Sequence, residues 1–323
     1  MRSYITRRIL TLPVVMLVVS FIVFSIIALA PGDPLETLYA ESGLASQEDI
    51  RNLRAYYHLD DPLPVRYLTW LGRLLLKGDF GKSRMFAVPV TDLLLERVPN
   101  TLVLSVSALL LGLLLSIPIG IYSAVRQYSV MDYVATVLAF LGRSMPGFWF
   151  ALMMIMFFSI YLDWLPVTGV QTMGANLTGW PMFKDRFLHA LLPVVTMGIL
   201  QVSGWVRYTR SSFLEVLNED YLRTARAKGL SERVVIFKHA FRNALIPIVT
   251  ILALDIPGLF GGAMVFETIF SWPGVGRLMY DAIMNKDFNL ALCALVMISF
   301  LTIAASLLGD IFYAVVDPRI EYK

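Results

Sequence analysis

The apolar residues of the chain gather in six runs, and a polar segment separates each run from the next. A helix needs about 20 mostly apolar residues to cross the hydrocarbon core of a bilayer, and all six runs are close to this length. We therefore predict an all-α integral membrane protein with six transmembrane helices. The predicted spans cover residues 9–30, 101–123, 136–160, 190–207, 245–266 and 289–314.

The first run could be a cleaved signal peptide or a retained span. It follows three arginines and ends in Ala28-Leu29-Ala30, which resembles a signal-peptidase site. However, its 22 residues exceed the roughly 7 to 15 of a signal peptide. The proline at position 31 also disfavours cleavage. We expect a retained span with the N-terminus inside the cell.

Composition agrees with a membrane protein. Hydrophobic residues make up 57% of the chain and charged residues 16%, with a mean hydropathy of +0.68, whereas soluble domains are about 25% charged. A net charge of +3 is too small to indicate nucleic-acid binding. The lone Cys293 cannot form an intrachain disulfide, and the three histidines are too far apart to predict a metal site. We expect no bound cofactor and no metal.

The charges of the connectors predict the orientation. Residues 207–242 carry eight basic and four acidic side chains, so under the positive-inside rule this segment faces the cytoplasm. Residues 31–99 carry ten acidic and eight basic side chains, and residues 267–287 carry three and two, which fits the outer face. Both termini are then cytoplasmic, and the long loop 31–99 after the first span is extracytoplasmic.

That outer loop contains patterned pieces. Residues 49–59 and 65–77 have the period of amphipathic helices and are separated by a proline-rich turn. Gly81-Lys82-Ser83 invites a nucleotide-binding interpretation, but a phosphate-binding loop needs glycine where this chain has Leu76. We therefore expect no ATP site in this chain.

The basic cytoplasmic segment has helical periodicity of its own. Apolar residues recur at spacings of three and four, which is typical of a helix with one apolar face: Phe213, Leu214, Val216, Leu217, Tyr221, Leu222 and Ala225. Glu219 and Asp220 stand near the predicted helix start, and Arg226 and Lys228 near its end, as the helix dipole favours. Gly229 is suited to end it, by left-handed or tightly packed geometry. The pattern indicates a docking helix, and the alternative is a solvated, charged linker.

The sequence of this segment resembles a known family pattern in two stretches. Residues 220–230 read DYLRTARAKGL and residues 239–247 read HAFRNALIP. This resembles the cytoplasmic loop of permeases in binding-protein-dependent ABC importers, in the variant of the dipeptide and oligopeptide branch. Arg223-Thr224-Ala225 stands where the general family pattern has Glu-Ala-Ala, and the spacing from Gly229 to Pro247 is longer. Both departures are similar to the peptide branch.

Other segments extend the resemblance over nearly the whole chain, and the long first outer loop resembles the B-type subunit rather than its C-type partner. These segments are residues 30–34, 59–64, 78–81, 99–102, 143–148, 267–276 and 317–319. The resemblance implies an ABC transmembrane type-1 domain over about residues 97–313. It also implies a multi-pass protein of the cell inner membrane that is not itself an enzyme.

The resemblance further implies partners: a second, C-type permease subunit, two ABC ATPase subunits, an extracytoplasmic solute-binding protein and a peptide substrate. Residues 208–243 are then the cytoplasmic coupling loop. Its expected coupling residues are Glu219, Asp220, Tyr221, Leu222, Thr224, Ala225, Arg226, Lys228 and Gly229. We expect Tyr221, Leu222 and Ala225 to pack into a groove on an ATPase subunit, with Arg226 and Lys228 at its rim.

One carboxylate lies inside a predicted span. Asp255 is about eleven residues into the fifth span, close to Pro257, Gly261 and Gly262, where a helix could bend. Intramembrane carboxylates usually face a bundle interior or an aqueous cavity. These four residues are candidates for the translocation pathway. Asp255 could attract the amino end of a peptide or pair with an arginine of the partner permease; alternatively, it is a locally solvated acid without a specific role.

Other functions are weighed against peptide import. Nickel complexes or glutathione are alternative cargoes, since similar permeases carry them. A secondary transporter would usually show inverted repeats or coupled charges inside several spans, and a membrane enzyme would need a nucleophile, base or metal cluster. Neither pattern is visible in the sequence.

Overall fold

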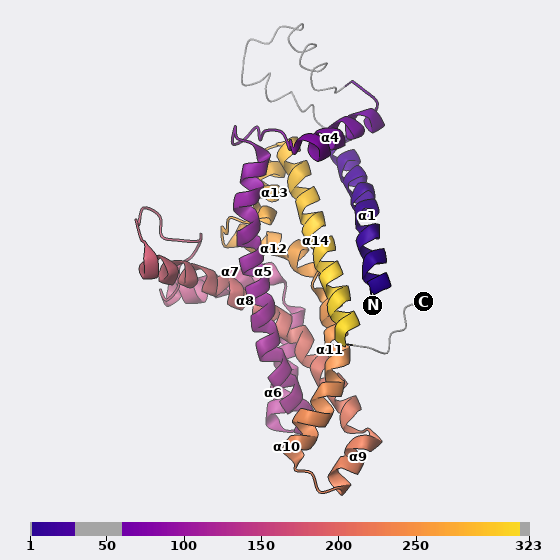
Figure 1. Ribbon diagram of the computed structural model, residues 1–323. Helices are drawn as coiled ribbons and strands as arrows, with labels where there is room; N and C mark the ends of the chain where they lie inside the picture. Colours follow the sequence, from indigo (N-terminus) through magenta and orange to yellow (C-terminus); the bar gives the residue numbers. More distant parts are fainter. Residues whose placement is uncertain (1, 30–59, 317–323) are drawn as a thin grey trace.

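A computed structural model describes residues 2–29 and 60–316 of the protein, and helices dominate this part of the chain (Figure 1). The described ranges contain no strand, only an isolated bridge between Lys82 and Pro89. The all-α class is therefore confirmed for these residues. The helices are α1 (Arg2–Ala28), α4 (Leu63–Lys77), α5 (Val90–Val125), α6 (Val130–Ser144), α7 (Gly147–Met154), η1 (Ile155–Tyr161), α8 (Gly179–Leu217), α9 (Asp220–Ala227), α10 (Glu232–Val234), η2 (Val235–Ala240), α11 (Phe241–Asp255), α12 (Gly258–Ile269), α13 (Val275–Met284) and α14 (Phe288–Val316), with η1 and η2 being π-helical.

Four helical segments are each long and apolar enough to cross a membrane: Ile9–Ala28, Val90–Val125, Gly179–Leu217 and Phe288–Ile311. A fifth candidate is the pair Val130–Ser144 and Gly147–Tyr161, which is bent by 107°. The apolar run 245–266 is divided between α11 and α12. The number of six spans therefore remains a prediction, as does the orientation of the termini.

Proline explains both interruptions. Pro146 follows Met145, and the residue before a proline is pushed out of the α region; Met145 accordingly has φ −81° and ψ 132°. The predicted span 136–160 is thus two helices rather than one. Likewise, Pro257 separates α11 from α12, because a proline removes a hydrogen-bond donor from the helix interior.

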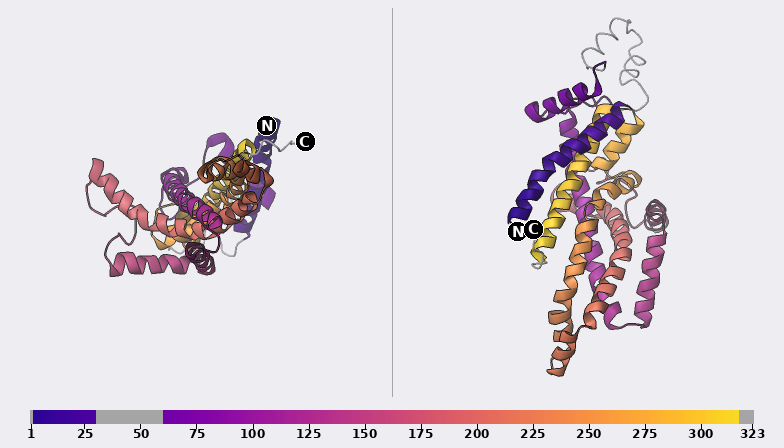
Figure 2. Two further views of the ribbon diagram at one scale, coloured as in Figure 1. Left: turned by 90° about the horizontal axis from the view of Figure 1, so that it is seen from below. Right: turned by 90° about the vertical axis from the view of Figure 1, so that its right-hand side faces the viewer.

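The long helices α5 and α8 form the centre of the bundle and pack along much of their lengths (Figures 1 and 2). Glycines allow this close approach, as is common between helices in membranes. A Cβ atom on Gly120 of α5 would lie 2.5 Å from the Cβ of Thr209, and one on Gly112 would lie 2.8 Å from the Trp205 ring. On α8, a Cβ on Gly198 would lie 2.9 Å from Leu111. Larger side chains at these positions would force the two helices apart.

The helix α4 lies across the end of the bundle and corresponds to the second predicted loop helix (Figure 1). Gly78 ends it in the left-handed conformation, with φ 61°. Tyr67 fixes α4 to α1: its hydroxyl lies 2.9 Å from the Ser20 hydroxyl, and its ring packs edge-on against Phe24. The first predicted loop helix, residues 49–59, and the rest of 31–59 lie outside the described residues.

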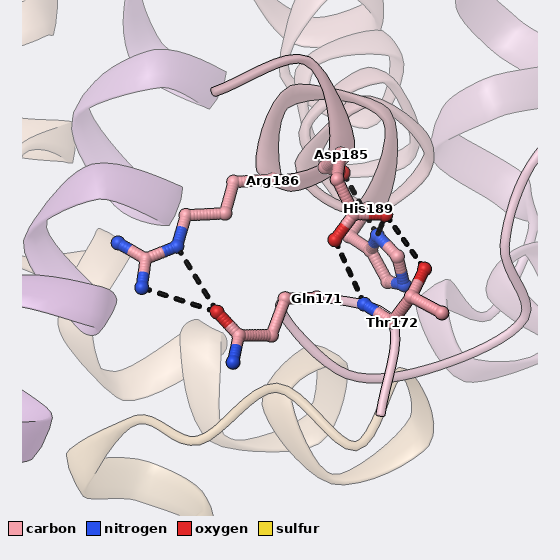
Figure 3. Close-up of polar contacts among 5 residues, drawn as sticks. All are labelled: Gln171, Thr172, Asp185, Arg186 and His189. Atoms are coloured by element: carbon pink, nitrogen blue, oxygen red, sulfur yellow. Dashed lines mark hydrogen bonds and ion pairs between the residues drawn. The ribbon is translucent and has the colours of Figure 1, made fainter. Parts of the chain in front are cut away.

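The connection from η1 to α8 is held by a polar cluster (Figure 3). The Thr172 hydroxyl donates to Asp185 Oδ1 at 2.6 Å, and the Thr172 backbone N–H donates to Oδ2 at 2.8 Å. Arg186 donates from Nη2 to the side-chain oxygen of Gln171 at 3.1 Å. His189 Nδ1 lies 2.8 Å from the Asp185 carbonyl oxygen. These contacts anchor the loop to the first turns of α8, which project sideways from the bundle (Figure 1).

Candidate coupling surface and pathway residues

The predicted coupling residues lie at the end of the bundle opposite α4 (Figure 1). Here α8 ends at Leu217, the short helix α9 follows, and the chain returns through α10 and η2 to α11. Most of the predicted coupling residues belong to α9 or to its ends. They are brought together by local sequence, since α9 spans only eight residues.

The inner face of α9 is packed against the protein itself. Leu222 is fully buried and Ala225 is 7% exposed, in a cluster with Phe213 of α8 and Val235 of η2. This cluster also includes Ile121 and other residues from the end of α5. The prediction that Leu222 and Ala225 enter a groove on a partner is therefore revised: in this structure both side chains are covered by the chain's own helices.

The outer face of α9 is polar at most positions and exposed. Tyr221 is 39% exposed, and its hydroxyl accepts a hydrogen bond from Asn243 Nδ2 at 2.9 Å. Arg223 pairs with Asp220 at 3.3 Å, an i,i+3 contact on the helix surface. Phe237 on the neighbouring η2 is 66% exposed. Tyr221 and Phe237 are thus aromatic residues at this end of the bundle that a partner could cover.

Gly229 ends α9 through its backbone conformation. Its φ is +78°, in the left-handed region that residues with a Cβ rarely adopt. The Gly229 N–H donates to the Arg226 carbonyl at 2.9 Å, and the Lys228 N–H donates to the Thr224 carbonyl at 3.0 Å. A Cβ at Gly229 would meet nothing within 4 Å. The requirement for glycine is therefore conformational and does not come from tight packing.

An ion pair connects the end of α9 to α10. Arg226 donates from Nη2 to Glu232 Oε1 at 2.9 Å and from Nε to Oε2 at 3.2 Å, so the contact is bidentate. This hydrogen bonding lowers the pKa of Glu232 from its ordinary value and raises the pKa of Arg226. The pair bridges the turn around Gly229 and links the end of α9 to α10.

Asp255, the intramembrane candidate, is the last residue of α11. It is exposed, and its Oδ2 accepts a hydrogen bond from Trp205 Nε1 of α8 at 2.7 Å. Pro257 stands at the break that follows, and a Cβ on Gly261 would meet nothing within 4 Å. Gly262 belongs to α12. Asp255 and Gly261 therefore both have open space beside them.

A buried carboxylate that sequence reasoning had not singled out joins three helices. Glu267 of α12 is fully buried and accepts from the Thr101 hydroxyl of α5 at 2.6 Å and from the Arg277 N–H of α13 at 2.9 Å. A Cβ on Gly274 would overlap this carboxylate. The available signal was an acidic residue at the edge of an apolar run, followed by a Pro-Gly-Val-Gly turn. Within the described residues, no group of three His, Cys, Asp or Glu side chains could hold a metal ion.

Comparisons with known proteins identify the family. Residues 116–322 match the family described as binding-protein-dependent transport system inner membrane component. Residues 1–105 match the N-terminal region described for membrane components of the same transport systems.

Curated relatives match over the whole length. The oligopeptide transport system permease protein AppB of Bacillus subtilis is 44% identical over 323 residues, with all of both chains covered. The dipeptide transport system permease protein DppB of Escherichia coli is 37% identical over 340 residues, again with full coverage of both. The glutathione transport system permease protein GsiC of Salmonella choleraesuis is 36% identical with the same coverage.

A solved structure shares the fold. An inward-facing form of the MetNI methionine ABC transporter aligns with a TM-score of 0.54 and 18% identity, covering 70% of this chain and 97% of that one. The resemblance found in the sequence is confirmed: the chain belongs to the family of binding-protein-dependent transport system inner membrane components and is a multi-pass membrane protein.

Proposed function

We propose that the protein is a permease subunit of an ABC importer for dipeptides or oligopeptides. It forms the pathway with a second, C-type permease, and it is driven by ATP hydrolysis on two ATPase subunits and supplied by an extracytoplasmic binding protein. The relatives named as oligopeptide and dipeptide permeases support the cargo. Six spans with both termini in the cytoplasm complete the proposed arrangement.

The observation that carries this proposal is the way α9 is fixed to the bundle. Leu222 and Ala225 pack against the ends of α5, α8 and η2, and the Arg226–Glu232 pair closes the following turn. A load applied to α9 therefore reaches two long helices of the bundle directly. A flexible loop would absorb the same load, because it could move without moving the helices.

The contacts to the ATPase are assigned to the exposed face. Tyr221 and Phe237 provide apolar surface, while Arg223 and Lys228 provide charge at its edge. Aromatic residues surrounded by charged ones are typical of protein interfaces. Backbone carbonyls of Glu219 and Asp220 accept in the first turn of α9: the Leu222 N–H donates to Glu219 at 3.1 Å, and the Thr224 hydroxyl donates to Asp220 at 3.0 Å.

The test is reconstitution of the complete importer in liposomes with ATP inside and labelled dipeptide plus binding protein outside. We expect uptake that requires ATP and every partner subunit. Uptake by this chain and the second permease without an ATPase would instead indicate a secondary transporter, and hydrolysis of substrate by the isolated chain would indicate a membrane enzyme. Either result would overturn the proposal.

Glutathione is the second candidate cargo, because a relative named for glutathione transport is 36% identical over the full length. Glutathione is itself a tripeptide, so a similar pathway could serve it. Competition decides between the two: an excess of unlabelled glutathione leaves dipeptide uptake unchanged if dipeptides are the cargo, and abolishes it if glutathione is preferred. Nickel complexes are tested as unlabelled competitors in the same assay, and they abolish dipeptide uptake if they are the preferred cargo.

A further inference from the structure

A cavity of about 320 Å³ is lined by residues of α6 and α8. The helix α6 lies on the half of the bundle that carries α9 (Figure 1). The lining of the cavity is partly apolar and unusually rich in arginine. The lining residues are Thr136, Ala139, Phe140, Arg143, Ser144, Ser203, Val206, Arg207 and Arg210. A space of this size could admit the end of a small peptide.

Only one of the three arginines is neutralised. Arg210 makes a bidentate contact with Asp132, with Nε–Oδ1 2.7 Å and Nη2–Oδ2 2.9 Å. Arg143 and Arg207 form no ion pair or hydrogen bond with any residue that the structure describes; Arg207 stacks over the Tyr208 ring, 5.4 Å from its centroid. The cavity therefore contains two guanidinium groups without a counter-charge, which favours an anionic occupant.

The cavity borders an exposed strip of α8. The helix α6 packs on the side of α8 that carries Ser203 and Arg210, and α11 packs on the side that carries Trp205 and Ser212. Since successive residues of a helix are about 100° apart, Arg207 and Tyr208 fall between these two sides, and both are exposed.

Opposite charges flank this strip. On the α6 side, Arg143 Nη1 is 3.7 Å from the point where a Cβ on Gly204 would lie. On the α11 side, the Asp255 carboxylate accepts a hydrogen bond from the side chain of Trp205, the residue after Gly204. The neighbouring helices α7 and α12 contact each other, since a Cβ on Gly147 would lie 3.2 Å from the Phe266 ring.

We propose that Arg143 and Arg207 bind the terminal carboxylate of the transported peptide, while Asp255 receives its amino end from the other side of the strip. This inference rests on the proposed function. A peptide with free ends carries one charge of each sign, and the two walls supply the complementary charges. Phe140 and Val206 also line the cavity, so the carboxylate would lie beside apolar side chains, where its hydrogen bonds to the arginines are stronger than in open water.

The experiment compares a dipeptide that has a free carboxyl end with the same dipeptide amidated at that end, in the reconstituted importer. The binding protein has its own preference between the two substrates, but this preference is the same for wild type and variants. It cancels when the uptake rate of each variant is divided by the wild-type rate for the same substrate. We expect Arg143→Gln and Arg207→Gln to slow uptake of the free acid about tenfold or more, as loss of a charged hydrogen bond implies, and to leave the amide unchanged.

Arg126→Gln is the matched control. It removes an exposed positive charge at the end of α5, outside the cavity, so we expect no selective effect. Arg143→Lys keeps the charge and should restore most of the discrimination, which also covers the case in which Arg143→Gln fails to assemble.

Equal slowing of acid and amide would overturn the inference and indicate a structural role. Slowing that follows the content of anionic lipid in the liposomes, whatever the peptide, would also overturn it and assign the cavity to a lipid phosphate. Unchanged uptake of both substrates would show that the arginines have no role in transport. If the wild-type importer carries no peptide at all, the proposed function fails, and this result is distinct from the other three.

Discussion

The hydroxyl of Thr101 donates to the carboxylate of Glu267 over 2.6 Å, although the two residues are 166 positions apart. The same hydroxyl accepts from the Val275 N–H at 2.9 Å. Glu267 also accepts from the Arg277 N–H. One threonine and one glutamate thus join α5 to both α12 and α13, at the corner where the chain turns towards α14.

Replacing Thr101 by Val keeps the shape of the side chain and removes its hydroxyl. A buried acceptor that loses its donor costs about 1–3 kcal/mol, so we expect lower thermal stability of the purified protein, measured by intrinsic tryptophan fluorescence. Thr101→Ser keeps the hydroxyl and is the control; it should lose less. If Thr101→Val and Thr101→Ser unfold at the same temperature, the hydrogen bond is not the source of the stability.

Local features of the proposed coupling segment follow from sequence, while long-range features do not. The charges near the ends of α9 and its termination at Gly229 depend on neighbouring residues, which the sequence displays. Helical period also shows that α9 has an apolar face. It does not show what covers that face, so the pattern alone does not predict that Leu222 is buried within the chain.

The predicted spans show the same contrast between local features, which follow from sequence, and long-range features, which do not. An apolar run reports hydrophobicity and length, so the run 136–160 reads as one helix. The bend of 107° after Ser144 depends on Pro146 and on whether neighbouring helices accept the turn. Glu267 is a further example, because its partner Thr101 becomes adjacent only when α5 and α12 pack together.

The pair of Arg226 and Glu232 should respond to acid in one direction. The pKa of Glu232 is lowered from its ordinary 4.5 by hydrogen bonds from Arg226. The stabilisation is therefore fully present above pH 4.5 and is lost as the pH falls through the lowered pKa of the folded state. We expect hydrogen exchange of residues 226–234, corrected for its intrinsic pH dependence, to lose protection only below that value.

Substitutions of Arg226 and Glu232 isolate the contribution of this ion pair to hydrogen-exchange protection. Glu232→Gln should lower protection of the same segment by up to about fivefold at neutral pH, as exposed ion pairs contribute little, and should remove the loss of protection in acid. The exchange of Arg226 and Glu232 for each other should restore protection. A profile that keeps its acid-dependent loss in Glu232→Gln would assign the effect to another group.

Gly229 should be sensitive to the shape of the replacing residue. A β-branched side chain in the left-handed region costs roughly 1–2 kcal/mol, so Gly229→Val should displace the end of α9 and reduce peptide uptake together with substrate-stimulated ATP hydrolysis. Gly229→Asn is the control, because asparagine tolerates this region and the space around the Cβ is open. Full uptake and stimulation in Gly229→Val would show that the angle of α9 is not needed for coupling.

Asp255 is proposed to receive the amino end of the peptide, and substitution by asparagine tests its charge alone. In Asp255→Asn the side-chain amide oxygen can still accept from Trp205 Nε1, which contacts the carboxylate at 2.7 Å in the native chain, so assembly should be preserved. Because charge-assisted hydrogen bonds are about twice as strong as neutral ones, we expect uptake of dipeptides with free amino ends to fall roughly five- to tenfold. Uptake of N-acetylated dipeptides, relative to wild type, should stay constant.

Trp205→Phe is the control for Asp255→Asn: it removes the hydrogen bond but keeps the carboxylate, and it should retain the preference for the free amino end. Equal effects of Asp255→Asn on both substrates would instead assign Asp255 to helix packing or to a contact with the second permease.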